Sequence, residues 1–295
     1  MRINKLKSHA KINLALNITG KNKLLHKIES IVGFIDLHDV ISINEIKTNE
    51  HKISFYGKFS KKIGKKNTVE KLFAKLDKNS LLNKKKFRVR IKKNIPQESG
   101  LGGGSMNAAN VFNYLIKKKY VKLGQKKIKN ICDSIGSDVF LGIDFVNCIL
   151  SSNSKIKKFH DCPKYYTVCV KPNFGCSTKK IYSYVKTFSL PRFSTPKKYM
   201  FYPKFLTNQR NALEEIAFKN YPKLKKIALF LTVTKNPIFV RMTGSGSTII
   251  AYYNSLKNCK IAKAKFKRKF KNYWCIHIKN YINVIFLCYR NLILG

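Results

Sequence analysis

A glycine-rich segment at residues 100–105 (Gly-Leu-Gly-Gly-Gly-Ser) carries the clearest chemical signal in the chain. It lies between a strand-like run at residues 87–91 and a helix-like run that starts near Asn107. In this order, backbone N–H groups can close around phosphate oxygens, and the helix N-terminus adds a partial positive charge. The segment lacks the Gly-Lys-Ser/Thr of a Walker A loop and the spacing of a dinucleotide fingerprint. A tight structural turn is the alternative, but so many glycines before a serine favour phosphate binding.

Transfer of a phosphoryl group to an alcohol also needs a base and a positive charge. Lys11 lies in an alternating polar and apolar run near the N-terminus, and Asp138 follows a helix-like run that stops at Gly136. An aspartate can take the proton of the alcohol, and a lysine can hold charge near the attacking oxygen or the γ-phosphate. Spacing alone does not single out this pair, because most lysines and aspartates in so charged a chain are solvated.

Four motifs, in order over nearly the whole chain, resemble those of the GHMP kinase superfamily. They are Ala-Lys-Ile-Asn-Leu (10–14), His-Lys-Ile-Glu-Ser with Ile-Asp-Leu-His-Asp (26–30, 35–39), the glycine-rich segment with Gly-Ser-Asp-Val (100–105, 136–139), and Met-Thr-Gly-Ser-Gly (242–246). Within the superfamily they are most similar to the kinases that phosphorylate the 2-hydroxyl of CDP-methylerythritol in non-mevalonate isoprenoid synthesis. Homoserine or mevalonate kinases remain the alternative, which the first motif and the triple glycine disfavour.

The resemblance implies roles for individual residues. Lys11 and Asp138 match the catalytic pair, and His26 matches a position that recognises cytosine. ATP is implied as the phosphoryl donor, accompanied by Mg²⁺, with no metal-ligating side chain identified. The implied ATP loop comprises Pro96, Gln97, Glu98, Ser99, Gly100, Leu101, Gly102, Gly103, Gly104, Ser105 and Met106. The implied contacts to the second substrate are His26, Asn13, Thr243, Gly244, Ser245 and Gly246.

Several positions depart from the pattern of the superfamily. Leu25 replaces a tyrosine before His26, and His9 replaces a proline before the first motif. Glu98 brings a carboxylate close to the phosphates unless it points outward or toward Mg²⁺. Met106 replaces a serine and removes one hydroxyl that could serve phosphate or metal.

The order of the elements predicts an α+β fold. Strands are expected at residues 11–18, 28–35, 40–43, 87–91, 165–170, 238–242, 248–253 and 274–278, with a turn at 36–39. Helices are expected at residues 68–76, 107–118, 127–135, 177–187, 211–219 and 262–270. The resemblance implies two domains, residues 1–155 like domain 2 of ribosomal protein S5 and residues 156–295 ferredoxin-like. The apolar tail at residues 281–294 is not assigned to an element.

The formal net charge of +46 over 295 residues is the most unusual feature of the composition. Such a charge attracts polyanions, so a basic nucleic-acid-binding protein is the alternative class of function. The lysines are nevertheless spread along the chain, and lysine, asparagine and isoleucine share AT-rich codons, so base composition offers another explanation. Only residues 263–271 form a concentrated basic block.

The eight cysteines form no C-x-x-C pair, and no secretory or membrane-spanning segment is evident. These two features predict a cytoplasmic protein, while the sequence predicts no oligomeric state.

Overall fold

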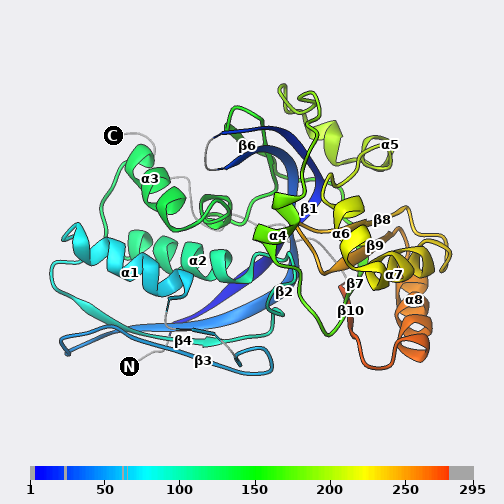
Figure 1. Cartoon of the computed structure of the whole chain (residues 1–295). Helices are drawn as coiled ribbons and strands as arrows, with labels where there is room; N and C mark the ends of the chain where they lie inside the picture. Colours follow the sequence, from blue (N-terminus) through cyan, green and yellow to red (C-terminus); the bar gives the residue numbers. More distant parts are fainter. Residues whose placement is uncertain (1–3, 23–24, 62, 65, 279–295) are drawn as a thin grey trace.

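The computed structural model describes residues 4–22, 25–61, 63–64 and 66–278 as two antiparallel-rich sheets flanked by helices (Figure 1). The strands are β1 (Asn4–Lys21), β2 (His26–Ile46), β3 (Lys52–Tyr56), β4 (Lys86–Lys92), β5 (Cys148–Leu150), β6 (Ile156–Lys158), β7 (Tyr166–Lys171), β8 (Phe239–Met242), β9 (Ile249–Tyr253) and β10 (Trp274–Ile278). The helices are α1 (Thr68–Lys78), α2 (Gly103–Lys117), α3 (Gln125–Ile135), α4 (Thr178–Ser183), α5 (Pro203–Leu206), α6 (Glu214–Asn220), α7 (Pro222–Thr232) and α8 (Leu256–Lys269). Short 3₁₀ turns are η1 (Phe140–Gly142) and η2 (Lys198–Phe201). The predicted α+β class is confirmed.

The first sheet has the strand order β3-β4-β2-β5-β6, and β1 pairs with β2. Strands β3 and β4 are parallel, and the connection between them contains α1. Figure 1 shows α1, α2 and α3 on one face of this sheet. The alternation of β4 explains the layering, because Phe87, Val89 and Ile91 are buried among these helices while the residues between them point outward.

The second sheet has the strand order β10-β7-β9-β8, with every neighbouring pair antiparallel. Taken in chain order, its four strands are arranged 4-1-3-2, the arrangement of a ferredoxin-like β-α-β-β-α-β unit. Helix α8 contacts β7, β9 and β10, and α7 contacts β8 and β9. The implied ferredoxin-like half is therefore present in the topology.

The two sheets share one apolar core. Ile12 of β1 lies in the same cluster as Cys169 of β7 and Ile250 of β9. A parallel bridge joins Leu16 to Asn211, so β1 also reaches the helical layer of the second half. Because β6 pairs with β5, the first sheet continues past residue 155. The division at residues 155 and 156 remains a prediction.

The prediction of a turn at residues 36–39 is wrong. Strand β2 runs without interruption through this segment and pairs with β1 on both sides of it. The register shifts between His9 and Ala10, so Asp36 and Leu37 are additional residues of β2 that face no partner on β1. This irregularity is a bulge, which accommodates additional residues inside a strand without ending it. Strands β3, β5 and β6 and helices α5 and α7 were not predicted, and α2 begins at Gly103, four residues before the predicted start.

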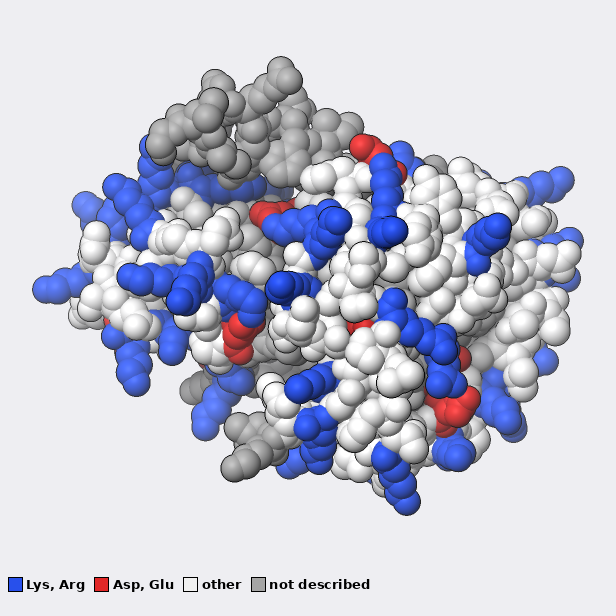
Figure 2. All heavy atoms as spheres, turned by 90° about the horizontal axis from the view of Figure 1, so that it is seen from above, with Lys and Arg blue, Asp and Glu red and all other residues white. Residues whose placement is uncertain are grey.

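The positive charge is dispersed over the surface. Figure 2 shows lysine and arginine side chains spread across the whole visible face, with few acidic groups between them. The basic block at residues 263–271 lies on and just after α8, where Phe266 is buried and stacks on Phe270. This arrangement fits the predicted solvated helix face over a core. No helix in the described residues is long and apolar enough to cross a membrane, and the apolar tail at residues 281–294 lies outside them.

Replacing exposed charges of this block is expected to leave catalysis nearly intact. Lys265, Arg268 and Lys271 are exposed, and screening at physiological salt acts over about 8 Å, so they contribute little to an enclosed site. The triple Gln variant should keep its kcat and KM while DNA retention at low salt falls. Phe266 and Phe270 stay unchanged so that packing is preserved. Loss of activity in a variant with normal circular dichroism would tie the block to catalysis.

Candidate active site

Lys11 and Asp138 meet in the structure although 127 positions separate them in the sequence. The Nζ atom of Lys11 lies 3.0 Å from Oδ2 of Asp138, and the two side chains are 6% and 28% exposed. Lys11 projects from β1, and its backbone N–H donates to the carbonyl of Leu101. Asp138 lies in the turn between α3 and η1, which the bond from Val139 N to Gly136 O closes. A buried ammonium thus faces a carboxylate that solvent can reach.

Asn13 fixes the position of the lysine. Its Oδ1 accepts a hydrogen bond of 2.8 Å from Lys11 Nζ, and its Nδ2 donates to Ser30 Oγ on β2. Ser30 Oγ in turn donates to the carbonyl of Ala15. Both the oxygen and the nitrogen of the Asn13 amide therefore have hydrogen-bond partners within the protein. This geometry indicates that Asn13 positions Lys11. Its predicted contact with the second substrate is untested.

The glycine-rich loop ends in a helix N-terminus that no side chain caps. Gly102 is the N-cap residue of α2 and has φ of +67°, a conformation that favours glycine. A Cβ atom at Gly102 would lie 2.7 Å from Cγ of Lys11, so the loop passes directly over the lysine stem. The first turn of α2 holds no acidic residue. Because the first N–H groups of a helix lack partners inside it, this end can receive an anion.

The second glycine turn, at residues 243–247, supports the first. A Cβ atom at Gly100 would lie 2.1 Å from the carbonyl oxygen of Thr243, so the two turns are stacked backbone on backbone. Thr243 Oγ1 accepts from Asn13 N at 3.0 Å and donates to Gly100 O at 3.2 Å. Asn211 Nδ2 donates to the carbonyl of Gly244, and Ser245 Oγ bonds Thr178 Oγ1. Gly246 N donates to Thr243 O. These contacts position the loop; contacts with a substrate are untested.

A buried ion pair beneath the loop was not found from the sequence. Asp39 is fully buried and pairs with Lys93, while its Oδ1 accepts from the N–H groups of Asn94 and Ile95. Asn107 of α2 donates to Asp39 Oδ2 at 3.0 Å. A Cβ at Gly103 would lie 3.4 Å from Lys93 Nζ, so the pair lies just under the helix start. Asp39 and Asn107 belong to the motifs, but the sequence did not distinguish Lys93 from the many exposed lysines of this chain.

Other members of the predicted ATP loop hold the loop in place. Gln97 Nε2 donates to the carbonyls of Phe59 and Lys61, and Ser99 Oγ donates to Pro96 O. Thr68, the first residue of α1, donates to Gly104 O at 2.7 Å. Thr68 also went unpredicted; the Asn67 cap that precedes it was the available sequence signal.

The structure decides where the two unusual loop residues point. Glu98 is exposed and turned toward Gly175, where an added Cβ would lie 2.2 Å from its Oε2. Its carboxylate also raises the pKa of Lys171, opposing the larger lowering by burial. Met106 is fully buried and belongs to an apolar cluster with Leu141. Leu101 is also fully buried, in a different apolar cluster. The Met106 side chain therefore cannot face a nucleotide, and its predicted role is restricted to the backbone.

His26 lies beside an aromatic group near the catalytic pair. Its ring centroid is 5.1 Å from that of Tyr182 on α4, and its Nε2 is buried with no hydrogen-bond partner in the described residues. Burial lowers the pKa of His26, with a smaller effect of Lys21 in the same direction. Burial also raises the pKa of Tyr182, and the charge of Asp138 adds to this effect. Tyr182, which was not predicted, thus contacts the His26 ring and lies within electrostatic range of Asp138.

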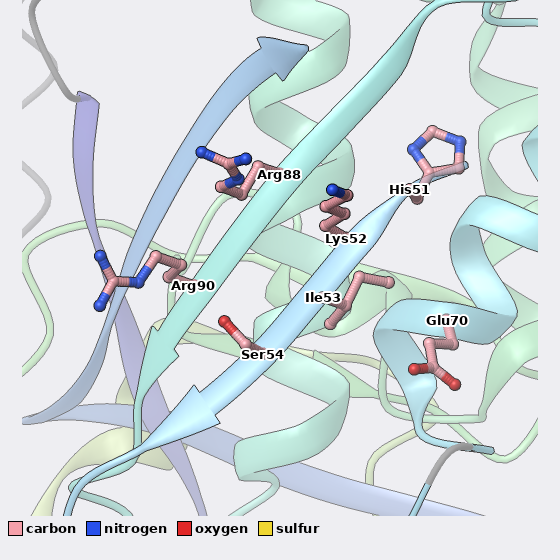
Figure 3. A pocket seen from close by; sticks show the side chains of 7 residues that line it. All are labelled: His51, Lys52, Ile53, Ser54, Glu70, Arg88 and Arg90. Atoms are coloured by element: carbon pink, nitrogen blue, oxygen red, sulfur yellow. The ribbon is translucent and has the colours of Figure 1, made fainter. Parts of the chain in front are cut away.

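A separate hollow of about 630 Å³ lies along β3, β4 and the first turn of α1 (Figure 3). Its lining includes Lys52, Arg88 and Arg90, and Figure 3 shows Glu70 on the neighbouring helix. None of the predicted site residues lines it. The site around Lys11 is therefore defined by its side chains and the loop, not by this hollow.

Comparison with known proteins decides the family. The model of the GHMP kinases N terminal domain matches residues 66–150. A 4-diphosphocytidyl-2-C-methyl-D-erythritol kinase of Pelagibacter ubique (strain HTCC1062) is 54% identical over 275 residues, spanning 93% of this chain and 98% of that protein. The chain belongs to this family of GHMP kinases. A kinase of the same name from Clostridium tetani (strain Massachusetts / E88) is 32% identical, spanning 86% of this chain and 94% of that protein.

Solved structures agree in fold. A crystal structure of 4-(cytidine 5'-diphospho)-2C-methyl-D-erythritol kinase superposes with a TM-score of 0.76 at 20% identity, spanning 93% of this chain and 99% of that chain. A homoserine kinase from Cytophaga hutchinsonii gives a TM-score of 0.70 at 13% identity, and the match spans 95% of this chain and 96% of that chain. The GHMP kinase fold expected from the four motifs is therefore confirmed, and the sequence relatives favour the first kinase over the second.

Proposed function

We propose that the chain transfers the γ-phosphoryl group of ATP to the 2-hydroxyl of 4-diphosphocytidyl-2-C-methyl-D-erythritol, with Lys11 and Asp138 as the catalytic pair. The 3.0 Å contact between these side chains, next to an uncapped helix N-terminus behind a glycine-rich loop, carries the proposal. The 54% identical relative supports the substrate. The same contact disfavours a purely nucleic-acid-binding protein, because such a function needs no lysine and aspartate of this geometry beside an anion site.

The geometry gives each member of the pair a task. Asp138, the more exposed of the two, takes the proton as the substrate oxygen bonds the γ-phosphorus. The bond from that phosphorus to the bridging oxygen breaks, and ADP leaves with the electron pair. The Lys11 ammonium, which Asn13 holds in place, offsets the negative charge that develops on the oxygens around phosphorus. The start of α2 and the backbone of the loop receive the phosphates.

The residues of this site fit a magnesium ion carried mainly by ATP. Mg²⁺ in kinases keeps several waters and uses few protein ligands besides phosphates. The Ser105 hydroxyl would hold it, because this residue lies in the first turn of α2 and its Oγ lies beside Gly136, two residues before Asp138. When bound, the ion neutralises phosphate charge. Glu98 is turned away toward Gly175 and does not contribute.

His26 and Tyr182 support recognition of the cytosine. Their rings lie close together, and Nε2 of His26 makes no hydrogen bond in the described residues, so a shift of the ring would let it bond a polar edge of the base. An aromatic ring beside a hydrogen-bonding group suits a flat heterocycle, which stacks on the ring and bonds at its edge. Leu25, in the place of the tyrosine common in the superfamily, is 69% exposed. Tyr182 thus takes the aromatic role from a different element of the chain.

Removing the charge of Lys11 is expected to lower kcat more than it raises the KM for ATP. Its ammonium interacts most strongly as charge develops in the transition state. Lys11→Met is preferred to Lys11→Ala because the methionine fills the space of the buried stem. Steady-state kinetics checks the split between the two constants. An effect on KM alone would move Lys11 from catalysis to binding.

An ATP-consumption assay against four alcohols tests the function. CDP-methylerythritol is expected to support saturable turnover, while mevalonate, homoserine and galactose support little. The Asp138→Asn variant run in parallel shows whether the signal comes from this site. Turnover with homoserine or mevalonate would select the alternative GHMP kinase reading, and turnover with none of the four would reject the proposal.

A further inference from the structure

The bulge between β1 and β2 gathers two histidines and an aspartate. His9 of β1 pairs across the sheet with His38 of β2, and Asp36 is one of the two additional residues of the bulge. The bulge brings the side chains of Asp36 and His38 together although they lie two residues apart on the strand. Among the described residues these three form the one group whose His, Cys, Asp or Glu ligand atoms could hold a metal, all within 4.8 Å of one another.

The spacing of the three ligand atoms suits a small tetrahedral ion. Asp36 Oδ1 lies 3.3 Å from Nδ1 of His38 and 3.9 Å from Nδ1 of His9. Ligands at about 2.0–2.2 Å from zinc lie about 3.3–3.6 Å from one another in a tetrahedron. The His38 distance already falls in this range, and a small rotation of the exposed Asp36 side chain brings His9 into it. Both Nδ1 atoms are buried and make no hydrogen bond in the described part of the chain.

The surroundings hold one ligand in place and leave the site open to solvent. Phe145 packs edge-on against the His9 ring, with centroids 5.6 Å apart, and limits its rotation. The Asp36 side chain is 57% exposed, which leaves an entry path and a position for water.

We propose that His9, Asp36 and His38 form a binding site for a divalent transition metal ion, Zn²⁺ being the best match. Two imidazoles and one carboxylate form a donor set suited to zinc, whereas Mg²⁺ prefers oxygen ligands alone. The site uses none of the residues placed around Lys11, and it is distinct from an ion carried by ATP. A bound ion links β1 to β2 two residues before Lys11 and one residue before Asp39, and so stabilises the strands that hold the catalytic lysine and the buried ion pair.

Titration of the full chain with Zn²⁺, after treatment with a chelator and in excess Mg²⁺, tests the proposal. Calorimetry is expected to show one ion per chain and thermal unfolding a higher Tm. His9→Gln, Asp36→Asn and His38→Gln should each weaken binding more than about 100-fold, because even loss of an outer partner of a ligand costs about 10–100-fold. His160→Gln is the matched control and should bind as the wild type does. Asp36→Asn alters an exposed side chain, so it remains informative if a histidine variant fails to fold.

Cobalt substitution separates this site from the cysteines. Burial raises the pKa of Cys132, Cys148 and Cys275 to about 12, which keeps these thiols protonated and poor ligands. Bound Co²⁺ should therefore show ligand-field bands without a sulfur-to-cobalt charge-transfer band. Binding that is unchanged in Asp36→Asn and His9→Gln, or that carries the sulfur band, would overturn the proposal, as would the absence of stoichiometric binding.

Discussion

Asp138→Asn is expected to lower kcat by about 10²–10⁴-fold, the usual contribution of a positioned general base. The amide has nearly the shape of the carboxylate but cannot take the proton of the substrate. The side chain lies in a turn closed by backbone hydrogen bonds, so the fold should persist. Affinity for ATP, measured by calorimetry, should stay close to that of the wild type, because the loop and the start of α2 are unchanged.

Asp133→Asn provides the matched control for this experiment. Asp133 lies on the nearby α3 and forms an exposed pair with Lys129 at 2.5 Å. Such surface pairs contribute little to stability, so this variant should retain kcat. Near wild-type kcat in pure Asp138→Asn would remove Asp138 from the role of base. Equal losses in both variants would point to a general effect of charge.

Gly102→Ala is expected to give the second large loss, through displacement of Lys11. An alanine Cβ at this position would lie 2.7 Å from Lys11 Cγ, which is closer than two non-bonded carbon atoms approach without a steric clash. The φ of +67° adds a conformational cost of about 1–2 kcal/mol for an L-residue. A displacement of about 1 Å in a catalytic group can cost about 10²-fold in rate. Measurement of kcat together with Tm separates the catalytic from the conformational part.

Gly124→Ala is the control for the glycine experiment. Gly124 has φ of −73°, and an added Cβ would have no heavy atom within 4 Å. This variant should keep its activity, and its Tm should fall only by the small preference of an N-cap for glycine over alanine. Unchanged kcat in Gly102→Ala would show that the loop does not fix the lysine. Gly103→Val tests ATP binding at the next position, where a Cβ would meet Ile95 Cγ2 at 3.1 Å and the nucleotide affinity should fall.

Local patterns in the sequence were sufficient for most elements, whereas the candidate catalytic residues came from the resemblance of the four motifs to the superfamily. Alternation over residues 87–91 predicted β4, and the glycine at position 136 predicted the end of α3. These signals succeed because the periods of strands and helices, and the conformational freedom of glycine, act within a few residues. Lys11 and Asp138 came from motifs in order, and the 3.0 Å contact between them agrees with that assignment.

Contacts between distant segments were decided by the tertiary structure alone. The sequence did not show that Thr243 lies on Gly100, that Glu98 turns toward Gly175, or that Met106 points into the core. Burial of Asp39 with Lys93 was equally hidden, because a charged side chain is placed inside only where partners from other elements satisfy it. The pairing register of β1 and β2 was also hidden from the sequence. A bulge changes which residues face each other across a pair of strands. Residues 36–39, predicted as a turn, therefore lie within β2 and bring Asp36 and His38 close to His9.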